Sequence, residues 1–144
     1  MTVDEVREWL ESYFYYGKKI LALESEMSEL RLRAMGSGIN YTGTQSSSKA
    51  NNTEKVLIDI ADEETRIETE INAVHTKRAE IRAVIDSLHN PDLEAVLITR
   101  YISGYTLEQT AQQLQYSVES VKKKTNKALM LLAKLYTKIP DNTL

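Results

Sequence analysis

The side chains best placed to do chemistry gather in one short basic stretch near the end of the sequence. Four lysines fall within six residues there: Lys122, Lys123, Lys124 and Lys127. On a helix, the outward face of this stretch would carry Val118, Glu119, Lys122, Lys123, Asn126 and Lys127. Ammonium groups pair with phosphates, and such a face suits the major groove of double-stranded DNA. A run of lysines is more often only a solvated surface, so its surroundings must decide between the two interpretations.

The rest of the chain has the opposite charge. The formal net charge is −3, yet residues 91–144 hold seven Lys and Arg against five Asp and Glu. Residues 1–53 and residues 54–90 are both net negative. The positive excess is therefore confined to the segment that carries the lysines, which favours nucleic acid as the partner of that segment.

Two short helices between residues 106 and 132 would position the lysines. Thr106 is a suitable N-cap, with Gln109 at the capping-box position. The first helix has one face made of Leu107, Thr110, Ala111 and Leu114. After a sharp turn, Ser117 caps a second helix, whose apolar residues recur at helical spacing: Val121, Ala128, Leu129 and Leu132. The pattern predicts a helix-turn-helix.

A third helix is predicted directly before this motif. Pro91 cannot continue a preceding helix and suits the first turn of the next one. The helix that it begins would run for about three turns and end at Ser103 and Gly104. We expect it to pack behind the other two helices in a core that includes Leu93, Val96, Leu97, Ile102, Leu107, Ala111, Leu114, Val121 and Leu129. Residues 90–144 are therefore expected to form one C-terminal domain.

The stretch from residue 106 to residue 132, TLEQTAQQLQYSVESVKKKTNKALMLL, resembles the helix-turn-helix of bacterial sigma-70 region 4. The matching residues keep that family's spacing: Thr106, Leu107, Glu108, Leu114, Ser117, Glu119, Val121, Lys127, Ala128, Leu129 and Leu132. The preceding segment, LHNPDLEAVLITRYISGYT, is similar to the family's lead-in, so the resemblance covers about residues 88–135. The sequence departs from the family at Gln115, where Gly is usual, and at Thr110, where Ile is usual.

That resemblance assigns base reading to Val118, Glu119, Ser120, Lys122 and Lys123. Val118 and Ser120 stand where housekeeping sigma factors carry Arg, which argues against an ordinary promoter element as the site. Glu119 can accept a hydrogen bond from a cytosine amino group, and either lysine can donate to guanine. Val118 can meet a thymine methyl group. The remaining basic residues are expected to contact phosphates: Lys124, Lys127 and, unless its role is structural, Arg100.

The N-terminal residues 1–89 are expected to form a helical hairpin. Residues 2–35 form one long helix, capped by Thr2, with an apolar stripe of Val3, Val6, Leu10, Tyr13, Phe14, Ile20, Leu23, Met27, Leu30 and Ala34. Residues 36–53 are dominated by Gly, Ser, Thr and Asn and are predicted to be a flexible loop.

The second long helix, from Thr53 to about His89, has a heptad seam of Leu57, Ile60, Glu64, Ile67, Ile71, Val74, Arg78, Ile81, Ile85 and Leu88. Such a coiled-coil stripe must be covered. The first helix can cover it in an antiparallel hairpin, and a homodimer through residues 57–88 can cover the remainder.

The whole arrangement also resembles the phage regulators grouped around ArpU and RinA, which implies a transcriptional regulator of late genes that acts with host RNA polymerase. Two alternatives stay open. One is a DNA-packaging component similar to a terminase small subunit, which also joins a helix-turn-helix to an oligomerising helix. The other is a module that binds RNA polymerase and scarcely touches DNA.

Other classes of function are not favoured. His75 and His89 have no nucleophile motif or carboxylate pair nearby, and cysteine is absent, so neither an enzyme, a metal site nor a cofactor is expected. No run of about 18 apolar residues suggests a membrane span, and the acidic N-terminus differs from a secretory signal. We therefore expect an all-α cytoplasmic protein without a membrane partner.

Overall fold

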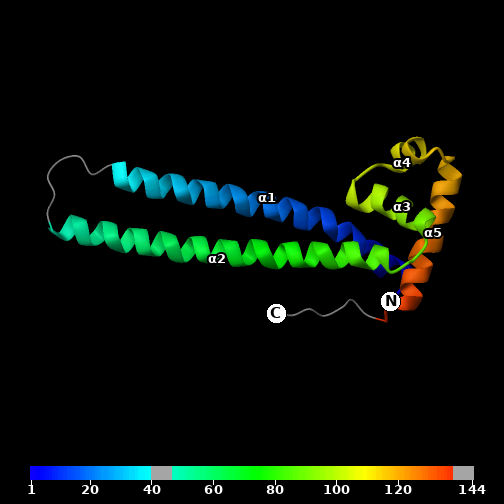
Figure 1. The fold of residues 1–144 in the computed structure, drawn as a ribbon, viewed down its shortest axis with the longest axis horizontal. Helices are drawn as coiled ribbons and strands as arrows, with labels where there is room; N and C mark the ends of the chain where they lie inside the picture. The colour runs from blue at the N-terminus through cyan, green and yellow to red at the C-terminus, as the bar shows by residue number, and fades with distance from the viewer. Residues whose placement is uncertain (40–46, 138–144) are drawn as a thin grey trace. The chain divides into compact units, whose positions relative to one another are not determined.

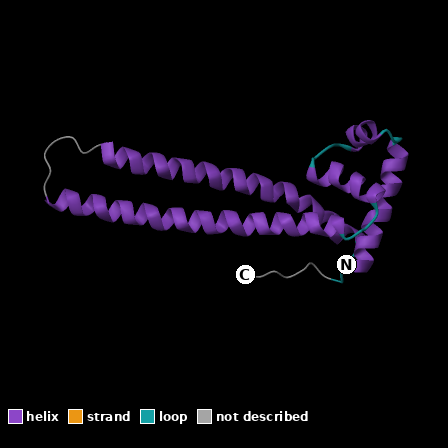
Figure 2. Ribbon diagram, in the orientation of Figure 1, coloured by secondary structure: helices purple, strands orange, loops and turns teal. Residues whose placement is uncertain are grey.

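The computed structural model describes residues 1–39 and 47–137, with side chains for residues 1–35 and 54–137. Every regular element in these ranges is a helix, as Figures 1 and 2 show. The elements are α1 (Val3–Ile39), α2 (Ser47–Asp86), α3 (Pro91–Leu97), the π-helical turn η1 (Ile98–Ile102), α4 (Leu107–Leu114) and α5 (Val118–Leu135). The predicted all-α fold with two long N-terminal helices is confirmed. No helix of the described ranges is both long and apolar enough to cross a membrane.

Contacts divide the chain into two compact units. The hairpin unit comprises residues 18–76, and the multi-helix unit comprises residues 1–17 together with residues 77–144. The first turns of α1 and the last turns of α2 thus belong to the same unit as α3, α4 and α5. The expected boundary between residues 89 and 90 instead assigns these turns to the N-terminal hairpin.

In the hairpin unit, α1 and α2 run antiparallel. Nζ of Lys19 lies 3.6 Å from Oε1 of Glu70, and Nε of Arg31, further along α1, lies 3.1 Å from Oε1 of Glu64, earlier in α2. The seam between the helices consists of Ile20, Leu23, Met27 and Leu30 of α1 with Ile60, Ile67 and Val74 of α2. The α2 residues are seven positions apart, which is the heptad spacing of a coiled coil. The predicted pairing of the two long helices is therefore confirmed.

The other seam residues of α2 in this unit, which alternate with Ile60, Ile67 and Val74, are less buried. Leu57 is 43% exposed, and Glu64 and Ile71 are partly exposed. Glu64 lies at the edge of the seam, where it can pair with Arg31 and keep contact with water. The homodimer expected through residues 57–88 stays a prediction.

The expected flexible loop over residues 36–53 is wrong at both of its ends. The first helix continues to Ile39 and the second begins at Ser47, so only residues 40–46 of that loop lie outside the described residues. The physical reason is that extending an existing helix costs far less than nucleating one. Ser and Asn oppose a helix by only about 0.5 kcal/mol each, which two long helices can absorb at their ends.

The core of the multi-helix unit joins the ends of both long helices to the C-terminal helices. It contains Val6, Trp9, Leu10, Ile81, Val84, Ile85, Leu93, Leu97, Tyr101, Ala128, Leu129 and Leu132. Trp9, which the expected stripe of the first helix omits, lies edge-on to Tyr136 with ring centroids 5.5 Å apart. This shared core holds α5 from the side opposite to its exposed face.

The helical stretch that begins at Pro91 consists of α3 and η1 and ends at Ile102, directly before the predicted Ser103 and Gly104. Oδ1 of Asn90 accepts hydrogen bonds from two backbone N–H groups of its first turn, those of Asp92 and Leu93. At the other end, Gly104 has a φ of +82°, a conformation that favours glycine. A Cβ at Gly104 would also lie 2.7 Å from the ring of Phe14. Both the turn and the packing of Phe14 therefore require glycine at this position.

Candidate nucleic-acid interface

The first helix of the predicted motif begins with a complete capping box. Oγ1 of Thr106 accepts a hydrogen bond from the backbone N–H of Gln109 at 3.1 Å, and Oε1 of Gln109 accepts one from the backbone N–H of Thr106 at 2.9 Å. Two otherwise unpaired backbone donors are satisfied in this way. The predicted start of α4 is confirmed.

Residues 115–117 connect α4 to α5. Gln115 has the left-handed conformation, with φ 60° and ψ 42°, and the backbone N–H of Tyr116 donates to the carbonyl of Ala111 at 2.9 Å. Oγ of Ser117 then accepts from the backbone N–H of Ser120 at 3.0 Å, which confirms the second predicted cap. The turn is therefore held by a hydrogen bond at each end, from Tyr116 to Ala111 and from Ser120 to Ser117, and these bonds set the direction of α5.

One face of α5 is buried and the other is exposed. The buried face consists of Val121, Thr125, Ala128, Leu129 and Leu132. In the first ten residues of α5 the exposed residues are Glu119, Lys122, Lys123, Asn126 and Lys127, and further along Met130, Leu131, Lys134 and Leu135 are exposed. The structure thus brings four of the predicted site residues, one acidic and three basic, onto a single accessible surface, which we call the lysine face. A helix that shows such a surface beside a capped turn has the geometry to enter a groove.

Two predicted base-reading residues are less accessible. Val118 is half-buried and packs against the small core of Val96, Ala111 and Val121. Ser120 is also half-buried, and its backbone N–H is held by Ser117. Both lie in the first turn of α5, beside the lysine face.

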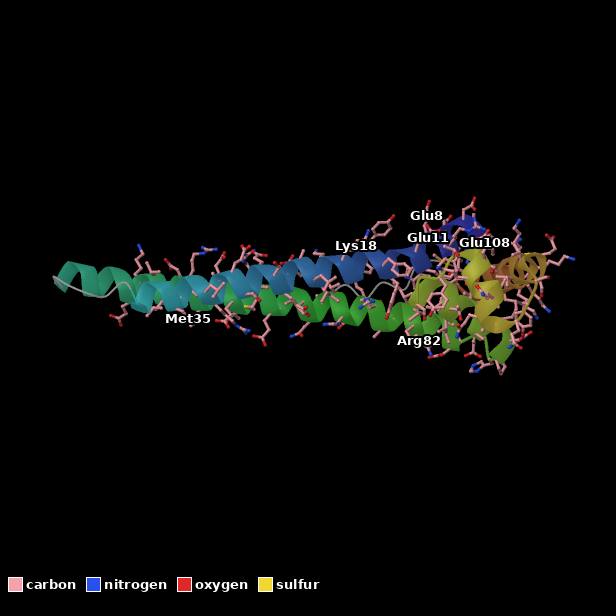
Figure 3. All side chains as sticks on the ribbon, turned by 90° about the horizontal axis from the view of Figure 1, so that it is seen from above. Glu8, Glu11, Lys18, Met35, Arg82 and Glu108 are labelled. Carbon is pink, nitrogen blue, oxygen red and sulfur yellow. The ribbon has the colours of Figure 1, made fainter. Side chains whose placement is uncertain are left out.

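Acidic side chains occupy other elements of the same unit. Glu8 and Glu11 of α1 and Glu108 of α4 are exposed, and they project on one side of the view in Figure 3. These carboxylates belong to α1 and α4, and they repel phosphates that approach those elements.

Lys124 differs from the other lysines because it is engaged within the protein. Its ammonium donates to Oδ2 of Asp92 and lies 4.8 Å from the centre of the Tyr116 ring. The Tyr116 hydroxyl donates to the other oxygen of the same carboxylate. The hydrogen bond from Lys124, reinforced by that from Tyr116, lowers the pKa of the Asp92 carboxyl, and the bond to Asp92 raises the pKa of Lys124. Both groups therefore remain charged at neutral pH.

Sequence reasoning does not find Asp92. The residue stands in the first turn of α3, where an acid is ordinary, and its partner Lys124 lies 32 positions away. No local pattern links two residues so far apart in the sequence. The sequence marks Asp92 only as one of five acids in the basic C-terminal segment.

Arg100 takes part in packing contacts of η1. Its guanidinium carbon lies 5.5 Å from the centre of the Tyr101 ring. Its Nε is buried and has no hydrogen-bond partner among the residues that the structure describes. These contacts favour the structural alternative for the Arg-Tyr pair over a phosphate contact.

A family model covers most of the elements described above. Residues 37–133, about two-thirds of the chain, match the family described as protein of unknown function (DUF1492). The chain belongs to this family. No curated protein and no solved structure matches the chain.

The matched region of this DUF1492 protein includes α2, α3, η1, α4 and nearly all of α5, and therefore the whole lysine face. Within the part of the chain that the structure describes, no group of three or more His, Asp and Glu side chains is placed to hold a metal ion. The lysine face and its capped turn are the candidate site.

Proposed function

We propose that this DUF1492 protein is a sequence-specific DNA-binding regulator of transcription that reads duplex DNA with α5. The observation that supports the proposal most is the exposure of Lys122, Lys123 and Lys127 on one face of a helix whose other face is fully packed. A rigid helix can hold several side chains against base edges at once, because packing has already fixed its direction. The two caps at Thr106 and Ser117 fix the turn that presents it.

The lysine face offers both kinds of contact that a sequence-specific protein needs. Phosphate contacts, which we assign to Lys127, would supply affinity that falls as salt rises. Base contacts supply the choice of sequence. Glu119 can accept from cytosine, and Lys122 and Lys123 can donate to guanine. Val118, which is half-buried in the same turn, could meet a thymine methyl group with its exposed part.

We further propose that α4 and α5 form a sigma-70 region 4-like helix-turn-helix, and that the protein is a phage or prophage activator of late genes which acts with host RNA polymerase. Support comes from the matching motif residues and from the two caps, which form at the positions that the resemblance assigns to them. The similarity to the ArpU and RinA group, with a helical hairpin before the motif, points in the same direction.

The test is to sequence the DNA fragments that the purified full-length chain retains from a random pool, and to measure binding to the enriched sequence against salt. We expect one enriched motif, bound far more tightly than scrambled DNA. The matched control is a chain with Lys122 and Lys123 both changed to Ala, which should lose the enrichment and keep its helical content. Retention of no duplex at low salt overturns the proposal.

The same preparation separates the two alternatives. A ring-shaped oligomer in light scattering would point to a packaging component, whereas a monomer or dimer fits a regulator. Capture of RNA polymerase without retention of any duplex would point to a polymerase-binding module.

A further inference from the structure

We propose that Asp92 restrains the phosphate affinity of α5 by holding Lys124, an inference that rests on the proposed DNA-binding function. Three of the four lysines in the first ten residues of α5 are exposed on the lysine face, and Lys124 is withheld by an internal carboxylate. The restraint would lower binding to DNA of every sequence by about the same factor, so less of the protein would be held on non-specific DNA at a given salt concentration.

The position of Asp92 is fixed independently of Lys124. Asn90 caps the backbone of α3 and Pro91 occupies its first position, so the second residue has little freedom. One carboxylate oxygen accepts from the Tyr116 hydroxyl and the other accepts from Lys124. The Tyr116 ring also lies beneath the Lys124 ammonium. Lys124 therefore has an acid and an aromatic ring as preorganised partners.

Stability alone is a weak reason for this arrangement. The side chains of Lys124 and Asp92 are 26% and 47% exposed, and ion pairs with such access to water add little to folding. Their effect on a polyanion is larger. A phosphate that approached Lys124 would have to displace the carboxylate or remain beside a negative charge, and either event weakens the contact.

Lys127 shows the phosphate contact that Lys124 could make without Asp92. Lys127 lies one helical turn beyond Lys124 on α5 and is exposed. Lys124 differs from Lys127 in its contact with Asp92, in its contact with the Tyr116 ring and in its partial burial. If both contacted phosphates, non-specific affinity would rise, because that affinity comes almost entirely from phosphate contacts.

The experiment compares Asp92→Asn with wild type on a random-sequence duplex, over a range of about 50 to 200 mM salt. Asn keeps the size of the side chain and removes its charge. We expect the variant to bind about three to ten times more tightly, with a salt slope steeper by about 0.9, the value for one added phosphate contact. Glu94→Gln removes the same charge from the same helix outside the Lys124 contact, and it should leave the slope unchanged.

Adding Lys124→Met to Asp92→Asn should restore the wild-type slope. A gain that survives this second change, or an equal gain in Glu94→Gln, overturns the inference, because the effect would then not pass through Lys124. An unchanged or weaker Asp92→Asn on DNA that wild type binds also overturns it and leaves the proposed function standing. If wild type binds no duplex, the proposed function fails, and the inference fails with it.

Two single variants test the inference even if Asp92→Asn fails to fold. Lys124→Met in the wild-type background should leave the salt slope unchanged, because this lysine already has its partner. Lys127→Met should make the slope shallower by about 0.9. Equal losses of slope from the two variants would show that Asp92 restrains nothing.

Discussion

The guanidinium of Arg78 stacks on the ring of Tyr13, with its carbon 3.9 Å from the ring centre. Gly17 of α1 also faces this guanidinium, because a Cβ at Gly17 would lie 3.2 Å from Nη2 of Arg78. A glycine that interrupts the apolar stripe of α1 thus makes room for a cation on the heptad seam of α2. Arg78 can therefore occupy a seam position because Tyr13 offers its guanidinium an aromatic ring and Gly17 leaves space for it.

This contact predicts that Arg78→Ala lowers the free energy of unfolding by about 1 to 2 kcal/mol, through the lost cation–π contact and the lost packing of the side-chain stem. Arg82→Ala is the matched control, because Arg82 lies one turn further along α2 and pairs with Asp86 at the surface. That change should cost no more than about 0.5 kcal/mol. Urea unfolding measures both variants, and equal losses would contradict the role given to Tyr13.

Thr110→Val is expected to stabilise the protein. Thr110 is fully buried, and its Oγ1 has no hydrogen-bond partner within the described part of the chain. Val has the same shape without the hydroxyl, so the change removes an unsatisfied buried group and should raise the free energy of unfolding by about 1 kcal/mol.

The control for Thr110 is a second buried threonine of the same unit. Oγ1 of Thr125 donates to the carbonyl of Val121 at 2.7 Å, so Thr125→Val removes a hydrogen bond that is made. It should lower the free energy of unfolding by about 0.5 to 1.5 kcal/mol. Thermal unfolding of both variants, followed by circular dichroism, should give shifts of opposite sign. Shifts of the same sign would count against the unpaired state of the Thr110 hydroxyl.

Gln115→Gly is expected to stabilise the turn before α5. Gln115 has a φ of 60°, and glycine reaches this left-handed conformation without the strain of a side chain. Since glycine is the preferred residue just past a helix, the change should add about 0.5 to 1 kcal/mol to the free energy of unfolding. Gln112→Gly, within α4, should instead cost about 1 kcal/mol. A loss of stability in Gln115→Gly would show that the glutamine side chain makes a contact of its own.

The features that sequence predicts correctly in this protein depend on residues close together in the chain. Thr106 with Gln109, and Ser117 with Ser120, are caps that act over three positions, and both form. The alternation of buried and exposed residues in α5 follows from helical periodicity alone. Local rules of this kind are sufficient to place α4, α5 and the lysine face.

The features that sequence misses depend on contacts between distant elements. Trp9 lies on the helical period of Val6 and Tyr13, but its contact with Tyr136, the residue after α5, joins parts of the chain that no local pattern links. Asp92 meets Lys124 only after α3 and α5 have packed. The helical ends at residues 36–39 and 47–53 are missed for another reason: local propensity is weak, and long helices override it.

The proposed division of labour on the lysine face gives the last prediction. If Lys122 donates to a base, Lys122→Ala should weaken binding to the enriched sequence by about 1 to 3 kcal/mol and relax the choice of base at one position. If Lys127 contacts a phosphate, Lys127→Ala should weaken binding to every sequence alike and reduce the salt slope by about 1. Both residues are exposed on the same helix, so the pair controls for the loss of one positive charge. An equal loss on all sequences from Lys122→Ala would make Lys122 a phosphate contact and transfer base reading to Glu119 and Lys123.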